Sequence, residues 1–225
     1  MTPWIELDTA TMPDGGGTLR LMRRGTEFSI MSGPIELMNS RLSGSEEALA
    51  ALACARIEAR PKSHVLIGGY GMGFTLRAAL ADLGPDARVT VAELVPAVVA
   101  WAREPMAAMT GDGLADPRTT VHLGDVGALI ASGRAAYDAI LLDVDNGPEG
   151  LTRRENDRLY SLAGLAAARR ALKPGGVLSV WSSSPNAVFA ERLAGAGYAV
   201  EEVKVRARPG KGKARHVIWI GTTPA

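Results

Sequence analysis

The chain has 225 residues, of which 47% are hydrophobic and 22% charged, with a formal net charge of +1 at pH 7. This length suits one α/β domain, or one domain with a small appendage, and the composition allows a sizeable buried core. A nearly neutral chain has no general attraction to nucleic acid or to an acidic membrane surface. No apolar run approaches the length that spans a bilayer.

The single cysteine, Cys54, excludes an internal disulfide bond and fits a reducing compartment. It lies in an amphipathic helical pattern, where a buried and unreactive thiol is favoured over a nucleophile. One cysteine and three histidines also make a zinc cluster improbable. The first residues lack the basic segment and apolar run of a signal peptide. We therefore expect a cytoplasmic protein without a metal site.

Residues 1–42 are predicted to form a small antiparallel β unit ahead of the main domain, residues 43–225. The strand-like runs are Trp4–Leu7, Thr18–Met22 and Glu27–Met31, around a turn cluster at residues 13–17. Ser32-Gly33-Pro34 is expected to end the third run. A helix should follow from about Glu46 to Ala59, with Ser43 or Ser45 as its N-cap.

From Ser63 onward strands and helices alternate, which predicts a parallel sheet covered by helices on both faces. The expected strands are His64–Gly68, Arg88–Glu93, Thr120–Leu123, Asp138–Asp143, Gly176–Ser182, Tyr198–Arg208 and His216–Thr222. The expected helices are Gly73–Leu83, Val95–Glu104, Val126–Ser132, Arg154–Leu172 and Pro185–Ala194. The segment before the last strand suits a hairpin and is too short for a helical crossover. We expect a doubly wound α/β fold with a seven-stranded mixed sheet.

The first strand of this region runs into a glycine-rich turn, which contains Gly69, Gly71 and Gly73, and then into a helix. Such a turn lets a ligand approach the backbone and the helix N-terminus, although many nucleotide-binding folds share it. Glu93 follows at the end of the next strand, where a carboxylate can accept both hydroxyls of an adenosine ribose. A bare surface charge is the weaker interpretation, because Glu93 directly follows an apolar run.

Acidic residues also follow the next two strands. Asp125 can bond an adenine amino group, cap the helix that begins at Val126, or do both. Asp143 ends an apolar strand and should point into the ligand crevice, with Asp145 two residues beyond it. Trp181, at the end of the fifth strand, is a candidate for the wall of an acceptor pocket. Met38 either covers the ligand or fills the small N-terminal core.

In this order and spacing, the glycine turn, Glu93, Gly124-Asp125-Val126, Asp143 and Lys173-Pro174-Gly175-Gly176 resemble class I S-adenosylmethionine-dependent transferases. The resemblance covers residues 63–222 and is strongest to the spermidine synthase, or aminopropyltransferase, branch. It implies a Rossmann-like class I methyltransferase fold and S-adenosylmethionine or its decarboxylated form as cofactor. The implied cofactor-binding residues are Gly69, Gly71, Gly73, Glu93, Leu94, Asp125, Val126 and Asp143, and the implied catalytic residues are Asp143 and Asp145.

The chain departs from the aminopropyltransferase pattern in places that bear on its substrate. Gly71 stands where those enzymes carry an aspartate for the amine of decarboxylated S-adenosylmethionine. Ser45-Glu46-Glu47 stands near the place of their Tyr-His-Glu. Without the aspartate the turn does not repel the carboxylate of intact S-adenosylmethionine. We therefore expect methyl transfer to a small-molecule acceptor, with aminopropyl transfer as the alternative.

Two further readings are weaker. A non-catalytic nucleoside-binding relative would not need Asp143, and a nicotinamide-dependent dehydrogenase does not fit the terminal hairpin. We expect no nucleic-acid or membrane partner. Relatives in the aminopropyltransferase branch suggest a homodimer.

Overall fold

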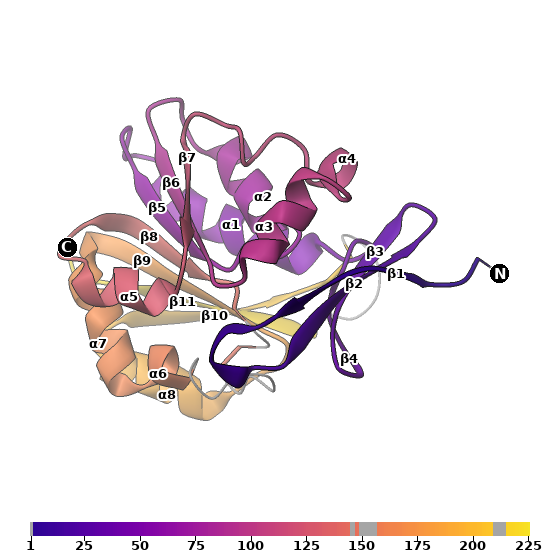
Figure 1. Ribbon diagram of the computed structural model, residues 1–225. Coiled ribbons are helices and arrows are strands. Elements are labelled where there is room, and N and C mark those ends of the chain that lie inside the picture. The colour runs from indigo at the N-terminus through magenta and orange to yellow at the C-terminus, as the bar shows by residue number, and fades with distance from the viewer. Residues whose placement is uncertain (1, 145–146, 149–156, 209–214) are drawn as a thin grey trace.

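The computed structural model describes residues 2–144, 147–148, 157–208 and 215–225. Within these residues the chain forms a small antiparallel sheet and a larger mixed sheet covered by helices (Figure 1). The N-terminal sheet lies to one side of the larger sheet, next to the ends of its central strands.

The N-terminal sheet has four strands in the order β1-β2-β3-β4. They are β1 (Ile5–Thr11), β2 (Thr18–Arg24), β3 (Glu27–Ser32) and β4 (Ile35–Asn39), with a short 3-10 turn η1 (Pro13–Gly15) after β1. The expectation of about three strands missed β4. Gly33, with φ of 54°, makes a tight turn that reverses the chain rather than ending the sheet.

The larger sheet has seven strands in the order β10-β11-β9-β8-β5-β6-β7. The strands are β5 (His64–Gly68), β6 (Arg88–Glu93), β7 (Thr119–Leu123), β8 (Tyr137–Leu142), β9 (Leu172–Ser182), β10 (Ala199–Val205) and β11 (His216–Thr222). β5 to β9 are parallel, whereas β11 is antiparallel to both of its neighbours. The central strand β8 is buried along its whole length, as expected of a strand covered on both faces. The predicted mixed sheet is thus confirmed.

Helices α1 to α4 lie on one side of this sheet and α5 to α8 on the other (Figure 1). They are α1 (Gly44–Ile57), α2 (Phe74–Asp82), α3 (Pro96–Arg103), α4 (Ala107–Thr110), α5 (Val126–Ser132), α6 (Asp157–Tyr160), α7 (Leu162–Ala171) and α8 (Ala187–Gly195). The single helix expected over 154–172 is wrong in one respect, because Ser161 interrupts it. The Ser161 hydroxyl accepts a hydrogen bond from the Gly164 N–H at 3.1 Å and so caps a new helix, α7.

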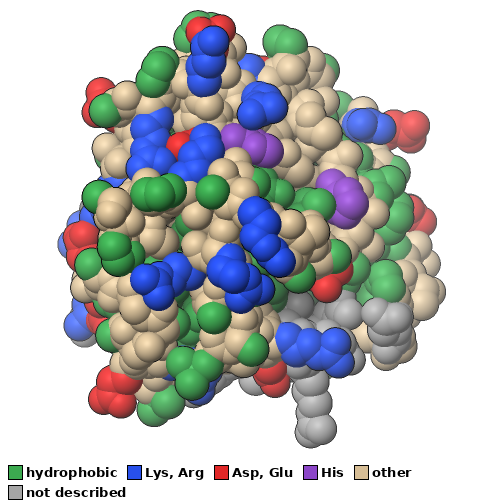
Figure 2. Space-filling model, turned by 90° about the vertical axis from the view of Figure 1, so that its left-hand side faces the viewer, with side chains coloured by type: hydrophobic (Ala, Val, Ile, Leu, Met, Phe, Trp, Pro, Cys, Tyr) green, Lys and Arg blue, Asp and Glu red, His purple; other side chains and the backbone are tan. Residues whose placement is uncertain are grey.

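Two hydrophobic clusters fill the interior, one on each side of the larger sheet. The first joins α1, α2 and α3 to apolar residues of the N-terminal sheet, including Leu21 and Phe28. The second lies under α5, α7 and α8 and includes Trp219 and Phe189. Figure 2 views the side of the molecule away from the N-terminal sheet, where Lys and Arg side chains spread over a face with only scattered hydrophobic groups. In the described part of the chain, no helix is long and apolar enough to cross a membrane.

Candidate active site

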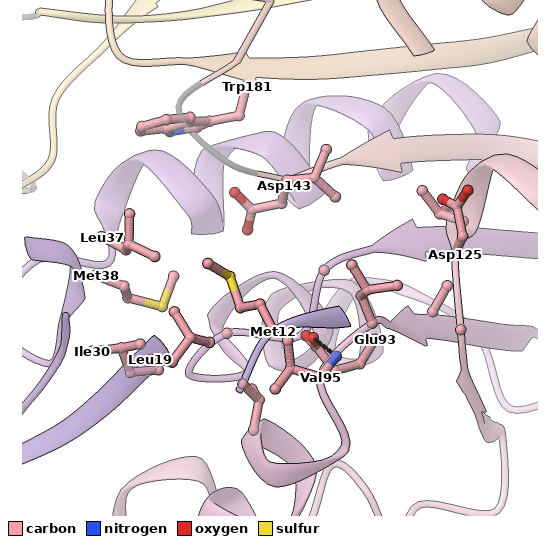
Figure 3. Close-up of a pocket in the computed structure, with 18 of the residues that line it drawn as sticks. Met12, Leu19, Ile30, Leu37, Met38, Glu93, Val95, Asp125, Asp143 and Trp181 are labelled. Carbon is pink, nitrogen blue, oxygen red and sulfur yellow. Dashed lines mark hydrogen bonds between the residues drawn. The ribbon is translucent and has the colours of Figure 1, made fainter. Parts of the chain in front are cut away.

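A cavity of about 190 Å³ lies between the N-terminal sheet and the carboxyl ends of the central parallel strands (Figure 3). Its apolar walls include Met12, Leu19, Ile30, Leu37 and Met38, all from the N-terminal β unit. Seven of the predicted site residues line it: Gly69, Gly71, Glu93, Leu94, Asp125, Val126 and Asp143. Gly73 is not among its lining residues, and Asp145 lies outside the described residues.

In the glycine turn after β5, the backbone lies so close to neighbouring groups that an added side chain would collide with them. Gly69 has φ of 86°, and a Cβ atom there would come within 2.4 Å of the Asp143 carbonyl oxygen. Gly71 has φ of 54°, and a Cβ there would lie 2.7 Å from the Met38 sulfur. Gly73, with φ of 75°, caps α2 and packs against the Tyr70 hydroxyl. Gly69 and Gly71 therefore face the cavity, whereas Gly73 serves the conformation of the turn.

Glu93 places a buried carboxylate at the floor of the cavity. Oε2 accepts the backbone N–H of Tyr70 at 2.9 Å, and Oε1 accepts that of Val95 at 2.8 Å. Burial raises the pKa of Glu93, and these backbone donors partly oppose the rise. Each carboxylate oxygen can accept more than one hydrogen bond, so Glu93 keeps acceptor capacity for ligand hydroxyls. This geometry suits the predicted ribose site.

Asp125 fulfils one of its two predicted roles. Its Oδ1 accepts the Gly127 N–H at 2.8 Å, which caps α5. The same residue lines the cavity beside Val126, on the side away from Leu37 and Met38 (Figure 3). Contact with an adenine ring therefore remains a prediction that the position of Asp125 allows.

Asp143 follows the last residue of β8, and its carboxylate points into the cavity between Trp181 and the methionines Met12 and Met38 (Figure 3). The Thr75 hydroxyl donates to Oδ2 at 2.6 Å. Burial and the nearby charge of Glu46 raise the pKa of Asp143 to about 7, against the lowering effect of the Thr75 hydrogen bond. A group with this pKa can take up and release protons near neutral pH.

Sequence reasoning missed Glu46 as a member of this site. The side chain lies in the first turn of α1, is only 8% exposed, and lines the same cavity as Asp143. The Ser45 hydroxyl donates to its Oε2 at 2.6 Å. Burial is the largest cause that raises the pKa of Glu46. Its place in the Ser45-Glu46-Glu47 departure was the available signal, but helix caps commonly carry such residues.

The cavity therefore has two chemically distinct ends. Glu93 and Asp125 offer hydrogen-bond acceptors at one end, as a nucleoside requires. At the other end lie two carboxylates and an aromatic ring, from Asp143, Glu46 and Trp181. This combination suits a bound cation. No cluster of three or more possible metal ligands occurs among the residues that the structure describes.

Comparisons with known proteins identify the family of the chain. Residues 44–191 match the model of the spermine/spermidine synthase domain. A polyamine aminopropyltransferase from Nitrosomonas europaea is 36% identical over 125 residues, which is 56% of this chain and 36% of that protein. Putrescine N-methyltransferase 3 from Nicotiana tabacum is 32% identical over 125 residues, covering 55% of this chain and 31% of that protein. Each match spans well under half of the relative's own length.

Among solved structures, spermidine synthase from Thermotoga maritima superposes with a TM-score of 0.76 over 96% of this chain and 72% of that one. At 15% identity this likeness shows the fold alone. The match of residues 44–191 to the domain model covers more than half of the sequence. The chain therefore belongs to the spermine/spermidine synthase family.

Proposed function

We propose that this protein transfers an alkyl group from a sulfonium nucleoside, S-adenosylmethionine or its decarboxylated form, to an amine. One observation carries the proposal: the Asp143 carboxylate, with its pKa raised to about 7, shares an apolar cavity with the nucleoside-type site around Glu93. A base with this pKa is matched to deprotonating an amine near neutral pH.

The residues present fit the proposed donor. Glu93 would accept the ribose hydroxyls, the turn at Gly69 and Gly71 would hold the chain attached to sulfur, and Asp125 with Val126 would contact adenine. When bound, such a nucleoside supplies a positively charged sulfur whose attached carbon is already activated for attack. The protein needs mainly to position the acceptor and to exclude water, because proximity and orientation supply much of the rate.

The chain's own groups can prepare the acceptor. Asp143 would take one proton from an entering ammonium group, which leaves the nitrogen lone pair free to attack. Thr75 fixes the Asp143 carboxylate through the 2.6 Å hydrogen bond. The indole of Trp181 and the carboxylate of Glu46 would stabilise the positive charge that returns to nitrogen as the new bond forms.

Aminopropyl transfer is the better supported form of this reaction. The family model describes spermine and spermidine synthases, and relatives from several organisms that match the chain are named polyamine aminopropyltransferase. The expectation of methyl transfer drawn from the sequence is thus less well supported than its alternative. We propose a polyamine-type amine as acceptor and the decarboxylated nucleoside as donor.

Methyl transfer remains a second candidate because of one feature of the turn. Gly71 carries no carboxylate for a propylamine, and Met38 fills the space in which a side chain at this position would lie. Relatives named putrescine N-methyltransferase also match the chain. An amine acceptor is common to both candidates, so the roles of Asp143 and Glu46 do not depend on the choice.

A homodimer in the cytoplasm, without nucleic-acid or membrane partners, stays part of the proposal.

Calorimetry with four ligands would test the donor: S-adenosylmethionine, its decarboxylated form, methylthioadenosine and NAD. We expect the decarboxylated form to bind at least about tenfold more tightly than the intact one. The reverse order would favour methyl transfer. Tight binding of NAD alone would contradict both candidates.

Turnover of putrescine with each donor would test the base. We expect Asp143→Asn to lower kcat by about 10²- to 10⁴-fold, the range of a lost general base, with nucleoside affinity nearly unchanged. In the wild type, kcat/KM should rise with pH through about 7, because only the ionised carboxylate accepts a proton. A flat profile, or full activity of Asp143→Asn, would remove Asp143 from catalysis.

A further inference from the structure

A chain of hydrogen bonds leads from the cavity into the protein wall. Glu46 Oε2 accepts from the Ser45 hydroxyl at 2.6 Å, and Ser45 Oγ lies 2.9 Å from Nδ1 of His216. The His216 ring packs against Trp181 with ring centroids 5.0 Å apart at 60°. His216 begins β11 and is half-buried, so part of the residue reaches the surface. The chain thus connects a carboxylate of the cavity with a histidine near solvent.

This connection has a chemical use that rests on the proposed function. An alkyl amine is protonated at neutral pH, with an ordinary pKa of about 10.4 for an amine of the lysine type. The ammonium loses one proton, its nitrogen forms a bond to carbon, and the carbon–sulfur bond pair passes to sulfur to give a neutral thioether. The product is again an ammonium ion. Each turnover therefore releases one proton into a largely apolar cavity, whether the group transferred is aminopropyl or methyl.

We propose that Glu46, Ser45 and His216 form a proton outlet that carries this proton from Asp143 to the solvent. Glu46 and Asp143 line one cavity, and the Glu46 charge acts on Asp143 strongly enough to raise its pKa. Two interacting carboxylates titrate as a coupled pair, and Glu46 lines the cavity into which Asp143 releases its proton, so Glu46 is the next carboxylate that can accept it. Nothing in the catalytic role of Asp143 alone requires Ser45 or His216.

The hydrogen bonds can run in either direction along this chain. With Glu46 ionised, Ser45 donates to Glu46, so His216 Nδ1 must carry a hydrogen and donate to Ser45. With Glu46 protonated, Glu46 donates to Ser45, and Ser45 donates to Nδ1. Passing from the second arrangement to the first moves one proton from Glu46 to His216. His216 completes the step by releasing a proton from Nε2.

The charges around Glu46 are negative and help to keep it protonated, whereas burial makes His216, at the other end of the chain of hydrogen bonds, hold a proton only weakly. Glu47, in the same turn of α1, and Asp143, across the cavity, are the charged groups that act on Glu46. Glu47 is itself paired with Arg77 at 3.5 Å. Burial lowers the pKa of His216, so the imidazolium is a ready proton donor. A proton that reaches His216 is thus released rather than held.

The structure offers a matched control elsewhere in the molecule. His64 is also half-buried, its Nε2 lies 3.0 Å from the Thr90 hydroxyl, and its ring packs against Tyr137 at 4.8 Å. Burial lowers the pKa of His64 as it does that of His216. His64 begins β5, at the end of the strand opposite the cavity. Thr90→Val and His64→Phe therefore imitate Ser45→Ala and His216→Phe without touching the proposed outlet.

Single-turnover rates of these four variants, measured from pH 5 to 9, test the proposal. We expect Ser45→Ala and His216→Phe to lower the rate at least about tenfold, less than the 10²- to 10⁴-fold loss of a group that touches the substrate. Both controls should keep the wild-type rate. Imidazole in the buffer should restore His216→Ala and leave His64→Ala unchanged. Wild-type rates and pH profiles in Ser45→Ala and His216→Phe would overturn the outlet.

Failure of the proposed function gives a different result. A wild-type protein that transfers no group from either donor contradicts the proposed function, and the outlet is then judged by NMR titration of labelled carboxyl and imidazole groups. Midpoints of Glu46 and His216 that move together in the wild type, and separate in Ser45→Ala, support the outlet. Independent titration of Glu46 and His216 in the wild type overturns it.

Discussion

At the scale of the residue, the carboxylate of Glu93 has two tasks: it binds backbone N–H groups of the protein and it faces the proposed ligand. It binds the backbone N–H groups of Tyr70 and Val95, which fixes the glycine turn relative to the end of β6. It also keeps acceptor capacity toward the cavity, where the proposed ribose would lie. An amide cannot do both, because one of its two polar atoms is a donor. Both tasks therefore require a carboxylate at position 93.

We expect Glu93→Ala to weaken binding of methylthioadenosine at least about 100-fold, since two charge-assisted hydrogen bonds of roughly 1.5–3 kcal/mol each are lost. Glu93→Gln should lose about tenfold, because its NH2 group faces a backbone donor. Calorimetry measures both, with circular dichroism to verify folding. The control is Glu46→Gln, a buried carboxylate of the same cavity at the reacting end. Equal affinity in Glu93→Ala and wild type would place the ribose elsewhere.

Single residues also show what a sequence can and cannot reveal about a site. Glu93 and Asp143 could be predicted, because each ends an apolar strand of a parallel sheet, and such ends meet at one edge. The contact between Ser45 and His216 could not, since it joins residues 171 positions apart in the sequence. Ser43 or Ser45 was predicted as the N-cap of α1, and the position belongs to Ser43, although its side chain makes no capping bond.

At the scale of the element, the glycine turn is confined from two sides that differ in rigidity. The Asp143 carbonyl faces Gly69, and it belongs to the backbone at the end of the central strand β8. The Met38 side chain faces Gly71, and methionine is flexible. Both glycines have positive φ, so both resist a side chain through backbone strain. The steric penalty, however, can be relieved only at Gly71.

Gly69→Ala should therefore destabilise the protein more than Gly71→Ala. We expect Gly71→Ala to cost about 1–3 kcal/mol for strain alone, and Gly69→Ala to add a similar amount for displaced backbone. Urea unfolding of both variants measures the difference. Gly25→Ala is the control for strain, because Gly25 has φ of 61° and open space around it. Equal losses at Gly69 and Gly71 would contradict this assignment of the contacts.

How well each strand could be predicted depended on the hydrophobic pattern of its own residues. Boundaries of β5, β6 and β11 were predicted correctly, because these largely buried strands, two parallel and one antiparallel, each contain an apolar run bounded by polar residues or glycine. The strand β4 was missed because it is short and mostly exposed or half-buried, and it contains no continuous apolar run. The cover that the N-terminal sheet places over the cavity could not be predicted either, since no local pattern encodes how two sheets meet.

At the scale of the whole molecule, one buried ionic cluster ties three distant segments together. Asp138, in β8, is only 2% exposed. Its carboxylate accepts from Arg60 at 2.8 Å, from Lys173 at 2.6 Å and from the backbone N–H of His64 at 2.7 Å. Burial acts to raise the pKa of Asp138, but these donors outweigh it and the pKa lies below its ordinary value. The cluster lies away from the cavity and contributes to stability rather than to catalysis.

A depressed carboxyl pKa gives stability that is complete above the unfolded-state value of about 3.9 and is lost as pH falls through the folded-state value. We expect Asp138→Asn to lower the free energy of unfolding by about 1.5–3 kcal/mol at pH 7, because Arg60, Lys173 and the His64 N–H lose a buried charged acceptor. The difference from the wild type should shrink below about pH 4, where Asp138 takes up a proton in the unfolded state, and should disappear as pH falls through the lower folded-state pKa. Urea unfolding at pH 7 and pH 3 measures both values.

The matched control is Asp116→Asn. Its carboxylate is also held by an arginine, Arg118, at 2.8 Å, and the hydrogen bonds from Arg118 lower the pKa of Asp116 to about 2. This pair lies near the surface, however, where water screens the charges, so its loss should change stability far less. If the two substitutions cost the same at pH 7, burial of Asp138 would not be the source of its contribution to stability.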